Sequence, residues 1–279
     1  MQLSRAEIDD FIDRALAEDV GRGDLTSYAT IPEGTQLKVA MVARQEVVVC
    51  GIDIAMAVFK RVRADIETQA LVKDGEKVNA KTVLARFSGD ARAILEAERT
   101  ALNILQHLSG IATVTRRYAE LVEGTGATLI DTRKTIPTLR NLAKYASFTG
   151  GARNHRLRLD DGVLIKDNHI AACGSLTAAV QRAKRVTPAL TVVEVECDTL
   201  DQVKEAVAAG AGMILLDNME PALLKQAVAI VAGRAVLEAS GGITLETIRD
   251  KASSGVDFVS VGRMTQSAPA VDIGLDYGV

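Results

Sequence analysis

Tryptophan is absent from this sequence of 279 residues, and aromatic residues make up only 3% of it. Proteins that hold single-stranded nucleic acid stack the bases on aromatic side chains, so this composition argues against such an activity. The net charge is −3, so no overall positive field attracts nucleic acid or an anionic lipid surface. We therefore expect neither a nucleic acid nor a membrane as a partner. An anionic ligand would need basic residues that are gathered locally.

Cysteine is also scarce. Cys50, Cys173 and Cys197 are widely spaced and form neither a CxxC pair nor a metal-ligand cluster, which is typical of reduced cysteines in a cytosolic protein. Residues 1–19 are acidic and amphipathic, unlike a secretory signal or a transit peptide. The longest nearly apolar run, residues 47–59, contains an aspartate and is too short to span a bilayer. We therefore expect a cytoplasmic protein.

Residues 1–108 carry the pattern of a small domain. Ser4 and Glu7 form a capping box ahead of apolar residues at helical spacing. β-branched residues then become frequent, and Asp74-Gly75 marks a turn between two later strands. A long helical pattern closes the segment. We predict an N-terminal α/β sandwich domain, which is an α+β arrangement of helix, antiparallel sheet and helix.

Short apolar runs alternate with helix-forming segments after this domain. The runs are ATLID, GVLIK, LTVVEVE, GMILLD, AVLEAS and FVSVG. Such alternation predicts a parallel α/β sheet that is buried on both faces. The steps from Glu196 to Asp217, Ser240 and Gly262 are 21, 23 and 22 residues, and no GxGxxG is present. This favours a barrel over a dinucleotide-binding open sheet. We predict a catalytic barrel over residues 109–266, with a seventh, irregular strand from GGARNHR.

Polar residues follow the apolar runs, at the strand ends that form the mouth of an α/β barrel and carry its chemistry. Seven such ends in register are hard to explain as solvated surface. They are Asp131–Lys134, Asn154–Arg156, Lys166–His169, Glu194 with Glu196, Asp217-Asn218, Ser240–Gly242 and Gly262.

The side-chain types at these ends indicate the ligand. The arginines, the lysines and His155 suit a substrate with several carboxylates or phosphates, because guanidinium groups bind them bidentately. The glycine turns SGG and VGR offer backbone N–H groups to a phosphate. Glu196 and Asp217 would repel anions, so we assign them to ribose hydroxyls or to a Mg²⁺ ion that carries a pyrophosphate. Together these features predict transfer from a sugar diphosphate.

The chain resembles the quinolinate phosphoribosyltransferase family over nearly its whole length. The resemblance is carried by EDVGRGDLT, ERTALNILQHLSGIAT, DTRKTIP, GGARNHR, LIKDNHI, VEVE, LLDN, EASGGI and VGRMTQSAPAVDIGLD. It implies a pentosyltransferase that joins quinolinate to 5-phosphoribosyl-1-pyrophosphate (PRPP) with Mg²⁺. The products would be nicotinate mononucleotide, an NAD precursor, together with pyrophosphate and CO₂.

The resemblance also implies an architecture. It consists of an N-terminal α/β sandwich domain and an incomplete, seven-stranded α/β barrel. The C-terminal tail, residues 267–279, would return to the first domain. The implied assembly is a homodimer or a multiple of dimers, with each site at a subunit interface.

Roles follow from the resemblance motif by motif. Arg133, His155, Arg156 and Lys166 would bind the quinolinate carboxylates. Lys134 would lie near the pyrophosphate. Glu196 and Asp217 would contact the ribose or the metal, directly or through PRPP. Arg99 would reach in from the partner subunit. The other substrate-binding residues, several of them at the 5-phosphate, would be Thr132, Ser240, Gly241, Gly242, Val261, Gly262 and Arg263. The expected catalytic residues are Lys134, Lys166, Glu196 and Asp217.

The sequence departs from the family pattern at three positions. Thr138 stands where a glycine is common after the proline of DTRKTIP, and Gln266 stands where the family has a histidine. Both departures bear on the shape of a loop. Arg263 stands where a small residue is common, and it either adds a phosphate contact or points to solvent.

Other interpretations remain open at this point. Lys166 at a strand end also fits a Schiff-base lysine of an aldolase-like lyase. The several arginines at the strand ends disfavour this, because an aldolase needs one phosphate site and a lone desolvated amine. A non-catalytic binding protein for an anionic metabolite, such as a molybdenum-operon relative of the family, is disfavoured by the intact TRK, NHR and KDN motifs. His169 either caps a helix, orients Lys166 or contacts substrate. We expect Glu194 and Glu196 to face opposite ways along their strand, with Glu196 at the mouth.

Overall fold

The structure is a computed structural model that describes residues 1–278. The chain folds into two compact units. The first unit holds residues 1–116 and 141–150 and the tail from Ser267, and the second holds residues 117–140 and 151–266. Within residues 1–278, no helix has the length and apolarity needed to cross a membrane.

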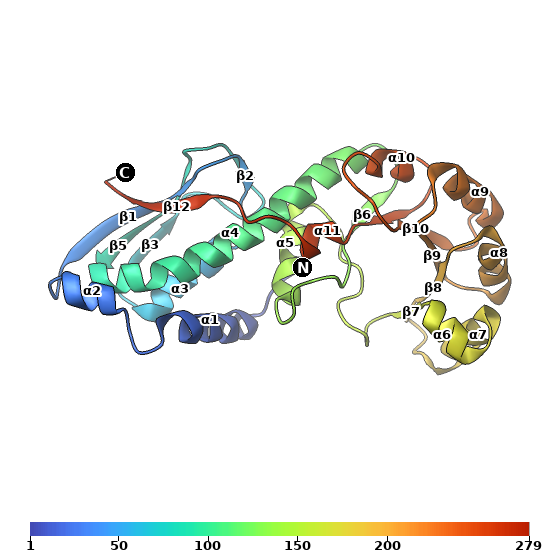
Figure 1. Ribbon diagram of the computed structural model, residues 1–279, viewed down its shortest axis with the longest axis horizontal. Coiled ribbons are helices and arrows are strands. Elements are labelled where there is room, and N and C mark those ends of the chain that lie inside the picture. The colour runs from blue at the N-terminus through green and yellow to red at the C-terminus, as the bar shows by residue number, and fades with distance from the viewer. Residues whose placement is uncertain (279) are drawn as a thin grey trace. The chain divides into compact units, whose positions relative to one another are not determined.

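The first unit is built on a four-stranded antiparallel sheet with the order β12-β1-β5-β3 (Figure 1). Its core includes the contact between α3 and this sheet, where the rings of Phe59 and Phe87 stack with centroids 4.0 Å apart. The predicted capping box of Ser4 and Glu7 is confirmed at the start of α1. The elements are α1 (Arg5–Val20), α2 (Leu25–Thr30), β1 (Gln36–Ala43), β2 (Val47–Val48), α3 (Ile52–Val62), β3 (Glu67–Ala70), β4 (Lys77–Val78), β5 (Val83–Asp90), α4 (Ala91–Val122), α5 (Arg140–Gly150) and β12 (Ile273–Tyr277).

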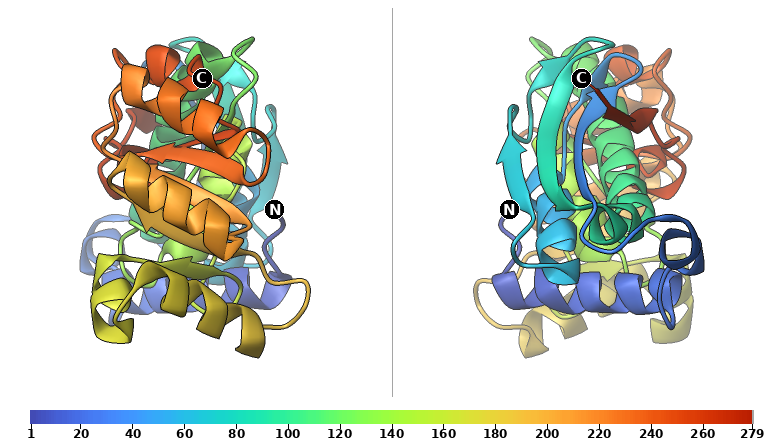
Figure 2. Two further views of the ribbon diagram at one scale, coloured as in Figure 1. Left: turned by 90° about the vertical axis from the view of Figure 1, so that its right-hand side faces the viewer. Right: turned by 90° about the vertical axis from the view of Figure 1, so that its left-hand side faces the viewer.

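The second unit is built on six parallel strands with the order β6-β11-β10-β9-β8-β7. Helices α7, α8 and α9 lie outside these strands, as the left view of Figure 2 shows. This alternation confirms the predicted α/β class. The elements are β6 (Thr128–Ile130), β7 (Val163–Ile165), α6 (Asp167–Cys173), α7 (Leu176–Val186), β8 (Val193–Cys197), α8 (Leu200–Ala209), β9 (Met213–Asp217), α9 (Pro221–Val231), β10 (Val236–Ser240), α10 (Ile248–Ala252), β11 (Phe258–Ser260) and α11 (Arg263–Gln266).

The expected seventh strand is reduced to a single parallel bridge between Ile130 and Arg153. The Arg153 N–H donates to the Leu129 carbonyl at 2.9 Å, and its carbonyl accepts from Asp131 N–H at 3.1 Å. The strand pairing stops after this bridge because the Asp131 carboxylate, and not a backbone carbonyl, accepts the next hydrogen bonds. It binds the His155 N–H at 2.9 Å and Asn154 Nδ2 at 2.7 Å.

The boundary between the units differs from the expected one at residue 108. Helix α4 runs without a break to Val122, and its residues as far as Arg116 belong to the first unit. Two glycines explain why distant segments join this unit. A Cβ on Gly110 would lie 2.2 Å from the Pro269 carbonyl oxygen, so only glycine lets the tail approach α4. A Cβ on Gly150 would lie 2.6 Å from the Ala112 carbonyl oxygen, which explains the close packing of α5 on α4.

Candidate active site

A cavity of about 360 Å³ opens among the carboxyl ends of the parallel strands. Parallel register explains why side chains that are far apart in sequence meet there. Asp217 at the end of β9, for example, lies opposite Ser240 at the end of β10. Nine predicted residues line the cavity: Thr132, Arg133, Lys134, His155, Arg156, Lys166, Glu196, Asp217 and Ser240.

Lys166 stands where β7 ends and α6 begins. Its ammonium group pairs with the Glu196 carboxylate across the strand ends. Its backbone N–H donates to Nδ1 of His169 at 2.9 Å. Of the roles considered for His169, this contact supports the helix cap. The cap also fixes the backbone from which the Lys166 side chain extends.

Arg133 and Arg156 lie close together in the cavity lining and are both half-buried. Burial lowers the pKa of Arg156, and the nearby Arg133 charge lowers it further. Nη1 of Arg156 donates to the Gly162 carbonyl at 2.9 Å. The buried Nε of Arg133 has no hydrogen-bond partner anywhere in residues 1–278. Because an unmade buried hydrogen bond is costly, both groups favour an anionic ligand.

The DTRK turn lies against the glycine that follows β11. The Lys134 N–H donates to Thr132 Oγ1 at 3.0 Å, and the Lys134 carbonyl accepts from Thr265 Oγ1 at 2.8 Å. A Cβ on Gly262 would lie 2.8 Å from Lys134 Cδ. Glycine at this position therefore keeps the backbone open beside two predicted substrate-binding side chains.

The ends of β9 and β10 form a second tight turn. Asn218 adopts a left-handed backbone with φ 53° and donates its N–H to the Ser240 carbonyl at 3.0 Å. Gly241 has φ 90°, and a Cβ there would lie 2.2 Å from Asn218 Oδ1. Ser240 Oγ accepts from Ser260 Oγ at 2.9 Å. The Asp217 carboxylate accepts from Asn218 Nδ2 at 2.6 Å, so Asn218 links it to the glycine turn.

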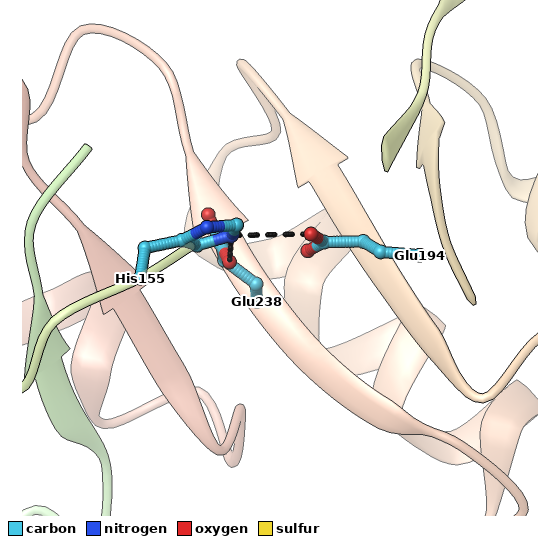
Figure 3. A group of neighbouring side chains, drawn as sticks. All are labelled: His155, Glu194 and Glu238. Carbon is cyan, nitrogen blue, oxygen red and sulfur yellow. Dashed lines mark hydrogen bonds and ion pairs between the residues drawn. The ribbon is translucent and has the colours of Figure 1, made fainter. Parts of the chain in front are cut away.

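One histidine and two glutamates, His155, Glu194 and Glu238, form a buried cluster (Figure 3). His155 Nε2 is 3.1 Å from Glu194 Oε2 and 3.3 Å from Glu238 Oε2. Burial and the Glu238 carboxylate raise the pKa of the Glu194 carboxyl to about 7, although its hydrogen bond to His155 opposes the shift. The expectation that Glu194 and Glu196 face opposite ways is wrong, because residues i and i+2 of a strand share a face. Both point into the barrel: Glu194 meets His155, and Glu196 meets Lys166 at the mouth.

Other predicted residues lie outside the cavity lining. Val261 is buried and its N–H donates to the Ile130 carbonyl at 3.1 Å, so this N–H is not available to a phosphate. Arg263 is exposed at the start of α11, and its charge acts on Tyr118 and Glu246. Gly241, Gly242 and Gly262 belong to the turns that border the lining, and Arg99 lies in the first unit.

Sequence reasoning missed Glu238 and undervalued Asp131. Both are almost fully buried, with 1% and 0% of their surface exposed. The available signal was a single acidic residue inside an apolar strand, in AVLEAS and ATLID, because a carboxylate is rarely buried without a partner.

The fold is of the α/β-barrel class, and its cavity gathers several cationic side chains beside the carboxylates of Glu196 and Asp217. The model of the quinolinate phosphoribosyl transferase C-terminal domain matches residues 111–276, and that of its N-terminal domain matches residues 24–109. The chain therefore belongs to the quinolinate phosphoribosyl transferase family. It is a phosphoribosyltransferase of the α/β class.

Relatives and solved structures agree with this membership. The carboxylating nicotinate-nucleotide pyrophosphorylase of Mycobacterium leprae is 44% identical and covers 98% of this chain and 99% of its own length. A probable enzyme of that name from Synechocystis is 41% identical, over 96% of this chain and 92% of its own. The structure of the nicotinate-nucleotide pyrophosphorylase from Ehrlichia chaffeensis superimposes with a TM-score of 0.93 at 41% identity, covering 99% of each chain.

The loop after DTRKTIP yields a stability prediction. Thr138 adopts φ 69° and is exposed, although a left-handed backbone costs a residue with a Cβ about 1–2 kcal/mol. Thr138→Gly should therefore raise the free energy of unfolding by about 1 kcal/mol after the entropy cost of glycine is subtracted. Urea denaturation at 25 °C measures this change. Thr138→Ala is the matched control, because it shortens the side chain but keeps Cβ. A glycine variant no more stable than the alanine variant would contradict the assignment of strain.

Proposed function

We propose that this protein transfers the phosphoribosyl group of PRPP to the ring nitrogen of quinolinate and removes a carboxylate as CO₂. The products are nicotinate mononucleotide and pyrophosphate, and the reaction serves NAD biosynthesis. The observation that carries the proposal is the gathering of Arg133, Arg156 and Lys166 around one cavity. The proposal is supported by relatives named carboxylating nicotinate-nucleotide pyrophosphorylase at about 40% identity.

The quinolinate carboxylates bind at the arginine end of the cavity. The unpartnered Nε of Arg133 and the desolvated guanidinium of Arg156 supply directed donors. Lys166 supplies a third positive charge, which exchanges its contact with Glu196 for one with substrate. His155 lines the same wall. A dianion satisfies these groups better than a monoanion does, because each unmatched buried charge is costly.

The phosphoribosyl donor binds at the glycine turns. Backbone N–H groups of Gly241, Gly242 and Gly262, with the hydroxyls of Thr132 and Ser240, receive the 5-phosphate. Lys134 lies by the departing pyrophosphate. Glu196 and Asp217 line the same cavity, and carboxylate oxygens fit Mg²⁺, which keeps waters and phosphate oxygens as its other ligands. These two residues would hold Mg²⁺ directly or through PRPP, and the ion would neutralise pyrophosphate charge.

The chemistry needs no nucleophile from the protein, because the pyridine nitrogen attacks the anomeric carbon of the ribose. An oxocarbenium-like state forms as the bond to pyrophosphate breaks, and carboxylates near the ribose stabilise it. The protein holds the two substrates in line and stabilises the leaving group through Lys134. Once the ring nitrogen is bonded to ribose it is cationic. The electron pair left at the adjacent carbon by loss of CO₂ is therefore stabilised, and this carbon then takes up a proton from water to give nicotinate mononucleotide.

We further propose a cytoplasmic homodimer, or a multiple of dimers, in which the partner subunit's Arg99 completes each site. The support is that Arg99 is exposed on helix α4 of the first unit. An isologous dimer pairs the same surfaces of both subunits, so the Arg99 of each subunit can reach the site of the other.

A Schiff-base lyase is the less favoured alternative for Lys166. A lysine that attacks a carbonyl must be neutral, and it is usually desolvated or set beside another cation. The Lys166 ammonium group instead pairs with the Glu196 carboxylate and is partly exposed. A carboxylate partner suits an ammonium group that binds an anion rather than an amine that attacks a carbonyl.

Substrate selectivity tests the proposed function. The protein should form nicotinate mononucleotide from quinolinate and PRPP. Nicotinate lacks one carboxylate and leaves buried cations unpaired, so kcat/KM should be lower for nicotinate by on the order of 10³-fold. Chromatographic detection of the nucleotide with each acid measures this ratio. Equal turnover of the two acids would refute the carboxylate pocket, and no product from quinolinate would refute the reaction.

Complementation between inactive variants tests the shared site. Arg99→Ala and Lys166→Ala should each be nearly inactive. Mixed in equal amounts and refolded together, they should recover roughly a quarter of wild-type activity, because half of the dimers are mixed and each has one intact site of two. The matched control is Arg133→Ala mixed with Lys166→Ala. It should recover nothing, because both residues serve the same barrel. No recovery with Arg99→Ala, despite proven heterodimers, would place Arg99 in its own subunit's site.

A further inference from the structure

A second cavity of about 500 Å³ lies at the opposite ends of the same strands. It is lined by strand starts, including Val163, Val193, Met213, Val236 and Phe258. His155 and Arg156 line both cavities, whereas Glu194 lines the second and Glu238 lines the mouth. The cluster of His155, Glu194 and Glu238 therefore separates the two spaces within the second unit.

The two carboxylates of this cluster are unusually well buried. The exposed fraction of the side chain is 4% for Glu194 and 1% for Glu238, against 14% for His155. In the chain as described, Glu194 Oε1 has no hydrogen-bond partner. Figure 3 shows both carboxylates pointing at the same edge of the imidazole ring. Two buried anions that converge on one nitrogen need a positive or proton-donating group there.

That group is either a metal ion or the ring's own proton. The spacing alone permits a metal, because one ligand atom from each residue lies within 4.8 Å of the others. The hydrogen bond at the other ring nitrogen, Nδ1, distinguishes a metal ion from a ring proton. Nδ1 accepts the Arg156 backbone N–H at 2.7 Å, so its lone pair is already used. The ring proton therefore sits on Nε2, which donates to Glu194 at 3.1 Å. The Glu238 carboxylate lies 3.3 Å from the same nitrogen, and Nε2 has no lone pair to offer a metal.

The hydrogen bond at Nδ1 also couples the position of the His155 ring to the backbone of Arg156. Its backbone is held by His155 Nδ1, and its guanidinium group is held by the Gly162 carbonyl. The His155 N–H is anchored from the other side by Asp131 at 2.9 Å. The ring thus cannot turn without disturbing the arginine at the quinolinate end of the mouth.

We propose that Glu194 and Glu238 are positioning residues, which hold the Nε2–H of His155 and thereby fix Arg156 for the substrate carboxylate. This inference rests on the proposed function. The carboxylates need no contact with quinolinate, since they act through the ring. The charge of Glu194 also acts on Arg156, so the pair offsets part of the cost of burying positive charge.

Substitution of Glu238 tests the effect on the substrates separately. Glu238→Ala should raise KM for quinolinate about 10-fold or more, since a misplacement near 1 Å can cost up to 10²-fold. KM for PRPP should change by less than about 2-fold, because the glycine turns are untouched. Glu238→Gln keeps an acceptor oxygen and should show a smaller rise than alanine. Glu205→Gln is the matched control. Its carboxylate accepts from Thr177 at 2.9 and 2.7 Å between outer helices, and both KM values should stay unchanged.

Nitrogen NMR of the histidine rings supplies a readout that is independent of activity. In the wild type, His155 should show a proton on Nε2 and none on Nδ1. In Glu194→Gln/Glu238→Ala the ring should turn away from the Arg156 N–H, and the two tautomers should then exchange. An unchanged ring, or a proportional rise in KM for both substrates, would show that the carboxylates serve stability alone and would overturn the proposal. If the wild type forms no product, the proposed function fails, and the ring measurement still decides the positioning role.

Titration with Zn²⁺ and with Mn²⁺, without PRPP, tests the metal alternative. We expect no equivalent of either ion to bind in a way that depends on Glu238. One tightly bound ion in the wild type, lost in Glu238→Gln, would make the cluster a metal site and would overturn the assignment of the ring proton.

Discussion

Desolvated positive charge is the constraint on which the mouth of the barrel depends. Burial lowers the pKa of Arg156, and the nearby Arg133 charge lowers it further. Unpaired buried ions cost several kcal/mol, so such a pair persists only where anions compensate it. In the free protein part of the compensation for Arg156 comes from the charges of Glu194 and Asp161. The remaining donor capacity, including Nε of Arg133, is left for a ligand.

Much of the second unit could be predicted from the sequence, because each βα repeat carries the same two signals. An apolar run marks the buried strand, and the polar residue after it marks the mouth. Lys166, Glu196 and Asp217 follow this rule and do line one cavity. The regular step between repeats predicted a barrel, since equal units stack around a common axis. The capping box of helix α1 could also be predicted from the sequence, because it depends only on residues four apart or nearer.

Features that depend on distant contacts could not be predicted. The expected seventh strand stops after one bridge because the buried Asp131 carboxylate binds the following backbone. The return of the tail to the first unit was expected only through the family resemblance, because its close approach to helix α4 at Gly110 is a contact that no local pattern reveals. Glu194 was assigned to the wrong face through an error in strand periodicity, which concealed its contact with His155. At Thr138 the sequence showed the departure from the glycine of the family pattern. It did not show that this residue adopts a left-handed backbone.

A crystal structure of the protein with quinolinate bound tests the central claim most directly. The account predicts one quinolinate at the carboxyl ends of the strands, with its carboxylates within hydrogen-bond distance of Arg133, including Nε, and of Arg156. The His155 ring should keep its contacts with Glu194 and Glu238, and Lys166 should turn from Glu196 toward the ligand. Quinolinate bound elsewhere, or bound at the mouth with both guanidinium groups directed away from it, would contradict the claim that compensated arginines form the substrate site.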